Sequence, residues 1–469
     1  MVRTKRVVRV VYRLRESAVL HRNLMSHNSL EEVSKATKRR NPVERFRRAK
    51  CLTYLGSERR PTGFRHFYQL DRRRLSFFTS VGPRGLTEQS LRIAAAHAAL
   101  ANLMDLYSIT LPQEVVIEGI ELNRKALGFW KRTARNLAAE RLVEDNLPAQ
   151  ALDARWRSRS SLRGRMEPLP KSVPRGPLLA MSGGKESLAA LKLMKGESAC
   201  TLFFLHYPDA GWQHGGRLFR FFQRTHDCVK VRTDITGTGP LVEAFDCKAY
   251  GMFVIGQIAF SALLLMDRFS TISIGNEFSA NFGNGMHDGI PVNHQYDKSF
   301  SFAQELNAYL TEHVTAEFTH TSPFWSWHEY RIAETFFADD RYLKQWSSCN
   351  NSTSARLFCG ACAKCAFVFL LGAAHTDPLK IRRLMGANLL DDLELIRSLA
   401  DPEVRKPLEC VGTKEEVWVA LEDIWQKRVW RESPGLKYFA QHIRPRIASR
   451  LPSLRRHLMQ IQSLQPFIQ

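Results

Sequence analysis

The sequence predicts an α/β protein in which helices flank a parallel β-sheet. Between residues 178 and 275, apolar runs of strand length alternate with helical patterns, and this alternation is typical of βαβ units. The composition indicates a globular chain, since 44% of the 469 residues are hydrophobic and 24% are charged. These values exclude a disordered or collagenous chain, and the length is sufficient for several domains.

Four apolar runs mark the expected strands. Strands are expected at 178–181, 200–207, 229–233 and 271–275, with helices between them at 188–195, 217–226 and 249–266. The last of these helices has 18 residues without charge, which approaches the length of a membrane span. Because Gln257 and Ser261 interrupt its apolar character, and because it is a single such segment, we expect a helix buried in the core and no membrane span.

Charge and proline content divide the chain into five expected parts. A basic N-terminal extension precedes a helical, mixed α+β part, in which helices are expected at 90–107 and 122–139. A proline-rich linker then leads to the α/β domain, which is followed by a cysteine-rich helical part and a basic tail. The five parts are expected at 1–85, 86–170, 177–340, 341–430 and 431–469.

The chain is strongly basic. It carries 68 Lys and Arg residues against 46 Asp and Glu residues, a net charge of +22. Residues 1–90 contain 22 of these basic residues and only 7 of the acidic ones. Such a balance favours polyanionic partners, meaning nucleic acid, anionic membrane or phosphorylated substrates. The N-terminal part is therefore open to three interpretations: an organellar transit peptide, a nucleic-acid arm or a solvated extension.

A phosphate-binding loop is predicted between the first strand and its helix. The loop consists of Ser182, Gly183, Gly184, Lys185, Glu186 and Ser187. Its glycines permit a sharp turn, and free amides at a helix N-terminus bind anions. Two hydroxyls and an ammonium group add further donors. A Walker-type loop is excluded because Glu186 follows the lysine where Ser or Thr is required. A plain strand–helix turn is the alternative.

The same stretch resembles the PP-loop of the ATP-pyrophosphatase superfamily, whose usual form is Ser-Gly-Gly-x-Asp-Ser. This resemblance implies a PP-loop-type parallel sheet. It also implies an enzyme that uses magnesium, splits ATP between the α and β phosphates, and transfers adenylate to a substrate oxygen. Glu186 stands where Asp is usual. Its longer side chain keeps the charge but changes how magnesium or pyrophosphate is held.

A structural zinc site is predicted from four clustered cysteines, Cys349, Cys359, Cys362 and Cys365. Four thiolates complete a tetrahedral zinc site, and two-residue spacing lets neighbouring sulfurs reach one ion. Buried thiols or disulfides are the alternative. The other five cysteines are scattered along the sequence, and this pattern does not indicate the disulfide framework of a secreted protein. We therefore expect the protein to act in a reducing cytoplasm. The cluster also resembles the zinc site of 7-cyano-7-deazaguanine synthase, another PP-loop enzyme.

Several further stretches narrow the resemblance. They are 129–130 (Phe-Trp), 276–281, 293–300, 348–350, 388–392 and 406–413. Together with the PP-loop they resemble the UDP-N-acetylmuramoyl-L-alanyl-L-glutamate epimerase family over residues 90–425. The family implies an ATP- and magnesium-dependent inversion of the terminal L-glutamate to D-glutamate on a UDP-linked muramoyl dipeptide of peptidoglycan synthesis. Conversion of the carboxylate to an acyl-adenylate, with release of AMP and diphosphate, would make the Cα proton removable.

Four residues are candidates for the chemistry beside the loop. Cys410 is a candidate base because thiolates abstract Cα protons in amino-acid racemases, and a small buried hydrophobe is the alternative. His294 has a pKa suited to proton transfer, or it orients the peptide. Asn276 and Glu277 follow the fourth strand, where ligands gather at carboxyl ends. Glu277 is expected to hold magnesium or the adenylate, or to be a surface carboxylate.

Two other functions remain open at this point. A PP-loop protein with a zinc knot and a basic arm would suit tRNA, or a deazapurine-type precursor of a nucleobase. Few well-spaced aromatic residues precede Phe64, which makes nucleic acid the less favoured partner. A non-catalytic homologue, inactivated by Glu186 in the loop or by departures from the family pattern near Trp325–His328, is the third interpretation.

Overall fold

The computed structural model describes most of the chain beyond residue 46. The described ranges are 47–81, 85–170, 175–194, 200–207, 213–234, 238–349, 351–352 and 356–467. Residues 1–46 of the expected basic extension, including Lys38, Arg39 and Arg40, lie outside the described residues. Among the described residues, no helix is long and apolar enough to cross a membrane.

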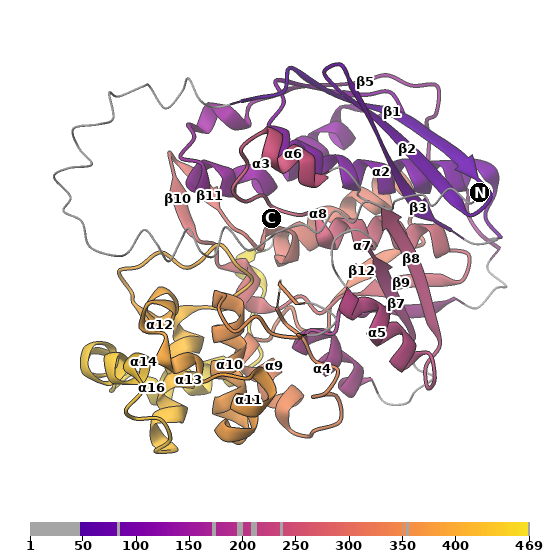
Figure 1. Cartoon of the computed structure of the whole chain (residues 1–469). Helices are drawn as coiled ribbons and strands as arrows, with labels where there is room; N and C mark the ends of the chain where they lie inside the picture. The colour runs from indigo at the N-terminus through magenta and orange to yellow at the C-terminus, as the bar shows by residue number, and fades with distance from the viewer. Residues whose placement is uncertain are drawn as a thin grey trace, which may run out of the picture. The chain divides into compact units, whose positions relative to one another are not determined.

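Ten strands form one mixed sheet (Figure 1). Their spatial order is β12-β9-β6-β7-β8-β3-β2-β1-β4-β5. The strands are β1 (Cys51–Arg60), β2 (Gly63–Leu70), β3 (Arg73–Ser80), β4 (Glu114–Ile117), β5 (Arg155–Ser158), β6 (Gly176–Ala180), β7 (Thr201–His206), β8 (Cys228–Asp234), β9 (Phe269–Ser273) and β12 (Thr319–Thr321). Two short strands, β10 (Gly285–His287) and β11 (Ile290–Val292), form a separate antiparallel hairpin.

The predicted α/β architecture is confirmed in the half of the sheet from β12 to β8. Every neighbouring pair in this half is parallel. The four predicted strands correspond to β6, β7, β8 and β9. Helices of this half are α4 (Lys185–Leu193), α5 (Gln213–Phe222), α6 (Thr238–Ala244), α7 (Val254–Ala262), α8 (Phe300–Tyr309) and α9 (Glu329–Phe337). The predicted core helix is found as α7, whose continuation Leu263–Leu265 is fully buried.

The other half of the sheet begins in the segment expected to be a basic extension. Strands β1, β2 and β3 form an antiparallel meander, and β3 joins this meander to β8. In β2, Phe64, His66 and Tyr68 are fully buried, whereas Arg65 is exposed. Buried and exposed residues therefore alternate along the strand, and arginine lies on its exposed face. The high net charge of this segment drew attention away from that alternation, which is typical of a strand. Residues 51–80 belong to the fold.

Two long helices pack against this half, as the sequence predicts. They are α2 (Glu88–Thr110) and α3 (Arg124–Glu144). Nearly every residue of α2 is buried, because it lies against both β1 and α7. Helix α3 is buried along one side only, and Trp130 on that side donates a hydrogen bond to the Tyr309 hydroxyl at 2.8 Å.

The C-terminal part is helical. Its helices are α10 (Ala363–His375), α11 (Pro378–Met385), α12 (Leu393–Ala400), α13 (Lys414–Gln426), α14 (Pro434–Tyr438), α15 (Arg444–Ile447) and α16 (Leu451–Met459). The expected basic tail after residue 430 is part of this bundle, because Leu436, Phe439 and Ile443 enter the same core as α10 and α13. These apolar residues are spaced by three and four positions, as on one face of a helix. The many basic residues of the segment made it look like a solvent-exposed tail instead.

Strand order determines where ligands gather. From β6 the chain proceeds to β7 and β8 on one side, whereas β9 and β12 lie on the other side. The order thus reverses between β6 and β9, and such a switch point opens a crevice at the carboxyl ends of the two strands. The predicted phosphate loop follows β6, and Asn276 and Glu277 follow β9.

Candidate functional site

The loop after β6 turns its backbone amides toward hydroxyl oxygens. The Gly183 amide donates to Ser187 Oγ at 3.1 Å, and the Lys185 amide donates to Ser348 Oγ at 3.3 Å. Gly183 has a φ of +81°, which favours glycine. A side chain on Gly275 would bring its Cβ within 2.8 Å of Glu186 Cβ, so glycine there allows the end of β9 to approach α4. Convergent donors at a helix N-terminus suit phosphate oxygens.

Lys185 is a fully buried cation held by two carboxylates. Its ammonium group forms ion pairs with Glu186 and with Glu329, the first residue of α9. Burial alone would raise the pKa of Glu186, but Lys185 and Lys298 outweigh it and lower that pKa to about 2. Sequence reasoning missed Glu329, because nothing in the local pattern at the start of α9 distinguishes it from a capping carboxylate.

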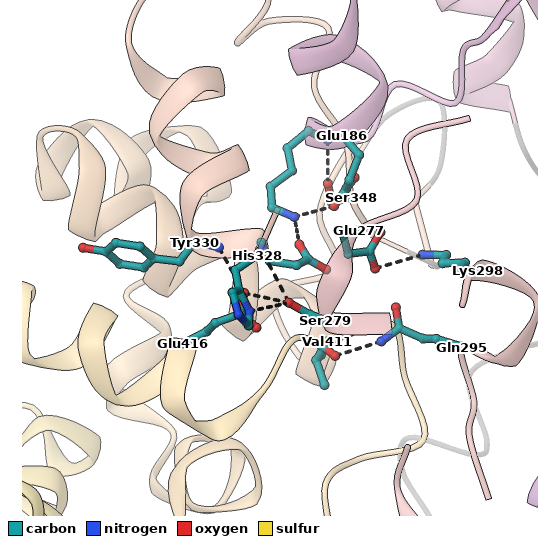
Figure 2. A network of polar contacts seen from close by, with 12 residues as sticks. Glu186, Glu277, Ser279, Gln295, Lys298, His328, Tyr330, Ser348, Val411 and Glu416 are labelled. Carbon is teal, nitrogen blue, oxygen red and sulfur yellow. Dashed lines mark hydrogen bonds and ion pairs between the residues drawn. The ribbon is translucent and has the colours of Figure 1, made fainter. Parts of the chain in front are cut away.

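Glu277 is buried, which excludes the surface-carboxylate interpretation. It is 1% exposed, and both of its carboxylate oxygens lack a hydrogen-bond partner within the described part of the chain. The nearest cation is Lys298, whose Nζ lies 3.9 Å from Glu277 Oε1 (Figure 2). Burial raises the pKa of Glu277. Its neighbour Asn276 is also buried, but its side-chain amide approaches His320 at 3.4 Å and not the loop.

The structure brings together three residues that are far apart in the sequence: Glu140, His294 and Cys410. Cys410 and His294 lie close enough for each to shift the pKa of the other. On the other side of the imidazole, His294 Nδ1 lies 2.5 Å from Oε2 of Glu140 on α3. Cys410 and His294 were both predicted as candidates, and the structure brings them together. Sequence reasoning missed Glu140, since a single carboxylate in an amphipathic helix normally faces solvent.

The loop that carries Cys410 is fixed on both sides of the cysteine. The carboxylate of Glu409 accepts hydrogen bonds from the first amides of α10, Ala363 at 3.2 Å and Lys364 at 3.0 Å. The carbonyl of Val411 accepts one from the Gln295 side chain at 3.0 Å (Figure 2). Because Gln295 adjoins His294, this last contact ties the thiol segment to the imidazole segment.

The charges around Cys410 favour a thiolate. Burial by itself would raise the pKa of the thiol. The Lys298 and Lys364 ammonium groups outweigh burial, and the hydrogen bond with His294 adds to them, so the pKa of Cys410 falls well below 9.0. A reactive thiolate requires such a cationic environment, whereas a structural cysteine does not. The interpretation of Cys410 as a mere buried hydrophobe does not fit these surroundings.

A second polar network nearby has a structural role. Ser279 donates to Glu416 Oε1 at 2.9 Å, and His328 Nδ1 lies 3.6 Å from the same oxygen (Figure 2). A nucleophile–base–carboxylate relay needs the two imidazole nitrogens to face different partners. Here Nδ1 faces both Ser279, at 3.3 Å, and Glu416. Glu416 also completes the capping box of α13, so the network joins α13 to the end of β9.

The four predicted cysteines converge. The sulfurs of Cys349, Cys359, Cys362 and Cys365 all lie within 4.8 Å of one another, and those of Cys359 and Cys365 are 3.8 Å apart. Sulfurs bound to one tetrahedral zinc at ~2.3 Å would be ~3.8 Å apart, so this donor set fits the ion. The cluster also supports the phosphate loop, because the Ser347 amide donates to the Gly183 carbonyl at 2.9 Å.

Two family models match the chain in the regions that carry much of this site. The model of the MurL N-terminal domain matches residues 254–322, and that of the MurL C-terminal domain matches residues 345–452. These two regions of the chain are therefore similar to the two MurL domains. The first region contains Glu277 and His294, and the second contains the cysteine cluster and Cys410. The phosphate loop and Glu140 lie outside both.

Curated relatives show a similarity of the same kind. A UDP-N-acetyl-alpha-D-muramoyl-L-alanyl-L-glutamate epimerase of Xanthomonas oryzae pv. oryzae is 27% identical over 283 residues, which is 58% of this chain and 61% of that protein. Proteins of the same name from Micromonospora sp. and Salinispora tropica are each 29% identical, over 56% and 55% of this chain and 59% and 58% of their own lengths. The chain thus spans about three fifths of each relative. No solved structure matches it.

Proposed function

We propose that this chain is a MurL-family, ATP-dependent epimerase that inverts the terminal L-glutamate of UDP-N-acetylmuramoyl-L-alanyl-L-glutamate. The relatives named for this reaction support the substrate. The observation that carries the proposal is the arrangement of Cys410, His294 and the nearby lysines, which favours a thiolate suited to abstracting a Cα proton. The phosphate loop supplies a nucleotide site whose Glu186 interacts electrostatically with the same Lys298.

The chemistry explains why ATP would be consumed in a reaction with little net driving force. A Cα–H beside an ionised carboxylate is a very poor acid, since the carbanion would face a full negative charge. Attack of that carboxylate on the α-phosphorus of ATP releases diphosphate and gives an acyl-adenylate, in which the acyl group no longer carries a negative charge. The Cα–H bond can then break toward the Cys410 sulfur, while the electron pair enters the acyl group. Reprotonation on the opposite face inverts the centre, and hydrolysis releases AMP and the free acid.

The protein groups in this scheme have separate tasks. The amides and hydroxyls of the Ser182–Ser187 loop would bind the phosphates of ATP. Carboxylate oxygens of Glu186, Glu277 and Glu329 suit Mg²⁺, a hard cation, and the unpartnered oxygens of Glu277 support that fit. Mg²⁺ would neutralise phosphate charge there. Zinc in the cysteine cluster would be structural, because four protein ligands leave no open position.

A reducing compartment suits this chemistry. All nine cysteines lie among the described residues, and none forms a disulfide there. Oxidation would remove both the Cys410 thiolate and the zinc ligands. We therefore propose the cytoplasm as the place where the chain acts, together with its UDP-linked substrate.

The test is an assay with purified protein, ATP, Mg²⁺ and UDP-N-acetylmuramoyl-L-Ala-L-Glu. Hydrolysed product should contain D-glutamate only when ATP is present, and AMP should accumulate with it. An ATP analogue with a methylene bridge between the α and β phosphates should block inversion, whereas a β,γ-methylene analogue should support it. Inversion without AMP would contradict the adenylate route. Absence of both products from folded protein would favour a non-catalytic homologue.

A further inference from the structure

Helix α3 places a buried carboxylate, that of Glu140, beside the His294 imidazole. Glu140 is 2% exposed, and its Oε2 lies 2.5 Å from His294 Nδ1. A carboxylate this deeply buried requires a compensating charge or hydrogen bond, since an isolated buried charge is very costly. The imidazolium form of His294 provides both.

The contact of Glu140 also determines which imidazole nitrogen faces the thiol. Since Nδ1 faces Glu140, Nε2 is the nitrogen left to interact with Cys410, whose segment is held beside His294 by the Gln295–Val411 hydrogen bond. Carboxylate, imidazole and sulfur therefore follow one another, which is the order in which a carboxylate orients a base and the base activates a thiol. Burial lowers the pKa of His294, but Cys410 and Glu140 together raise it to about 10.

We propose that Glu140 is a positioning residue that, acting through His294, keeps the Cys410 sulfur deprotonated and oriented toward the substrate. This inference rests on the function proposed above. The thiol proton resides on His294, so sulfur is free to accept the Cα proton. Glu140 touches neither sulfur nor substrate, and its effect passes through the imidazole. A position in α3 also makes the N-terminal part of the chain a component of the reaction centre.

Other charges act on the same sulfur and remain in place when Glu140 is changed. The ionisable groups facing Cys410 and His294 from the surrounding elements are Lys298, Lys364, Lys406, Glu277 and Asp297. The lysines alone favour a thiolate, so removal of Glu140 should shift the pH at which the thiol ionises without abolishing ionisation.

The test measures the rate at which iodoacetamide alkylates Cys410 between pH 5 and pH 9, with the modified peptide identified by mass spectrometry. Wild-type Cys410 should react at a nearly constant rate down to pH 6. In Glu140→Gln the midpoint should move upward by about one pH unit, so alkylation at pH 5 should be several-fold slower than in the wild type. The pH profile of epimerisation should shift in the same direction.

Glu144→Gln is the matched control, because it removes the same charge from the same helix one turn further on, and Glu144 forms no ion pair among the described residues. Its profile should equal that of the wild type. His294→Asn removes the connecting imidazole and should shift the profile as Glu140→Gln does, which provides a second test if the first variant does not fold.

The outcomes separate this inference from the proposed function. An unshifted profile in Glu140→Gln or in His294→Asn overturns the positioning role, even if D-glutamate is formed. If the pH profile shifts but the wild-type protein forms no D-glutamate, the positioning role is supported and the proposed reaction is contradicted.

Discussion

Two buried functional groups, Lys185 and Cys410, have opposite surroundings. Lys185 is a cation between the carboxylates of Glu186 and Glu329, whereas Cys410 is a thiol surrounded by cations. The first arrangement neutralises a charge that burial would otherwise disfavour, and it ties α4 to α9. The second creates a charge, because the lysines and His294 favour the ionised sulfur. A buried charge that is balanced by opposite charges thus contributes to stability, whereas an excess of positive charge around a buried thiol makes that thiol reactive.

The cysteine cluster supports the Lys185 region, and its loss should have the largest effect. We expect Cys362→Ser to reduce bound zinc from one ion per chain to none. The free energy of unfolding should fall by at least ~5 kcal/mol, since structural zinc contributes on the order of 10 kcal/mol in small domains. Metal analysis and urea denaturation measure both quantities. Cys200→Ser, a buried cysteine outside the cluster, should retain zinc, and zinc retained in Cys362→Ser would contradict the site.

The Cys410 region should show its largest effect in the rate of inversion. Cys410→Ser should lower the rate of D-glutamate formation by about 10³-fold, because a serine hydroxyl remains protonated where the thiol is ionised. AMP formation should persist, since the phosphate loop is unchanged.

Cys228→Ser provides the control for that variant. Burial raises the pKa of the Cys228 thiol to about 11, so this cysteine is not a thiolate. Its replacement should leave both rates within about twofold. Equal loss of AMP and D-glutamate in Cys410→Ser would mean that the two regions do not act separately.

The compensated charge at Lys185 predicts a change in stability. Glu329→Gln should lower the free energy of unfolding by about 3 kcal/mol, because it removes one partner of a buried ion pair. Glu334→Gln, at an exposed position of the same helix α9, should change it by less than about 0.5 kcal/mol. Equal values for the two variants in urea denaturation would show that Glu329 does not compensate Lys185.

The smallest effect is expected in the Ser279 network. Ser279→Ala should cost about 1 kcal/mol of stability, the usual value for one hydrogen bond. Because the network joins α13 to the end of β9 and is not a relay, the rate of inversion should change by less than about twofold. A loss of 10²-fold or more would instead indicate a catalytic serine.

The two regions differ in how much of them the sequence predicts. The phosphate loop and the cysteine cluster are local patterns, in which spacing alone brings donors together, so both could be predicted. Cys410 and His294 could be named only as candidates. Glu140 and Glu329 are single residues on helices, and their contacts depend on how distant elements pack. Strands β1–β3 were concealed in a similar way, because arginines on their exposed faces dominate the composition.

The most direct test of the central claim is to run the reaction in D₂O and measure deuterium at Cα of the glutamyl residue. Each D-glutamyl product should carry one deuterium in place of its Cα proton, and inversion should require ATP. A D-glutamyl product that retains its original Cα proton, or that forms without ATP, would contradict proton abstraction from an acyl-adenylate at Cys410.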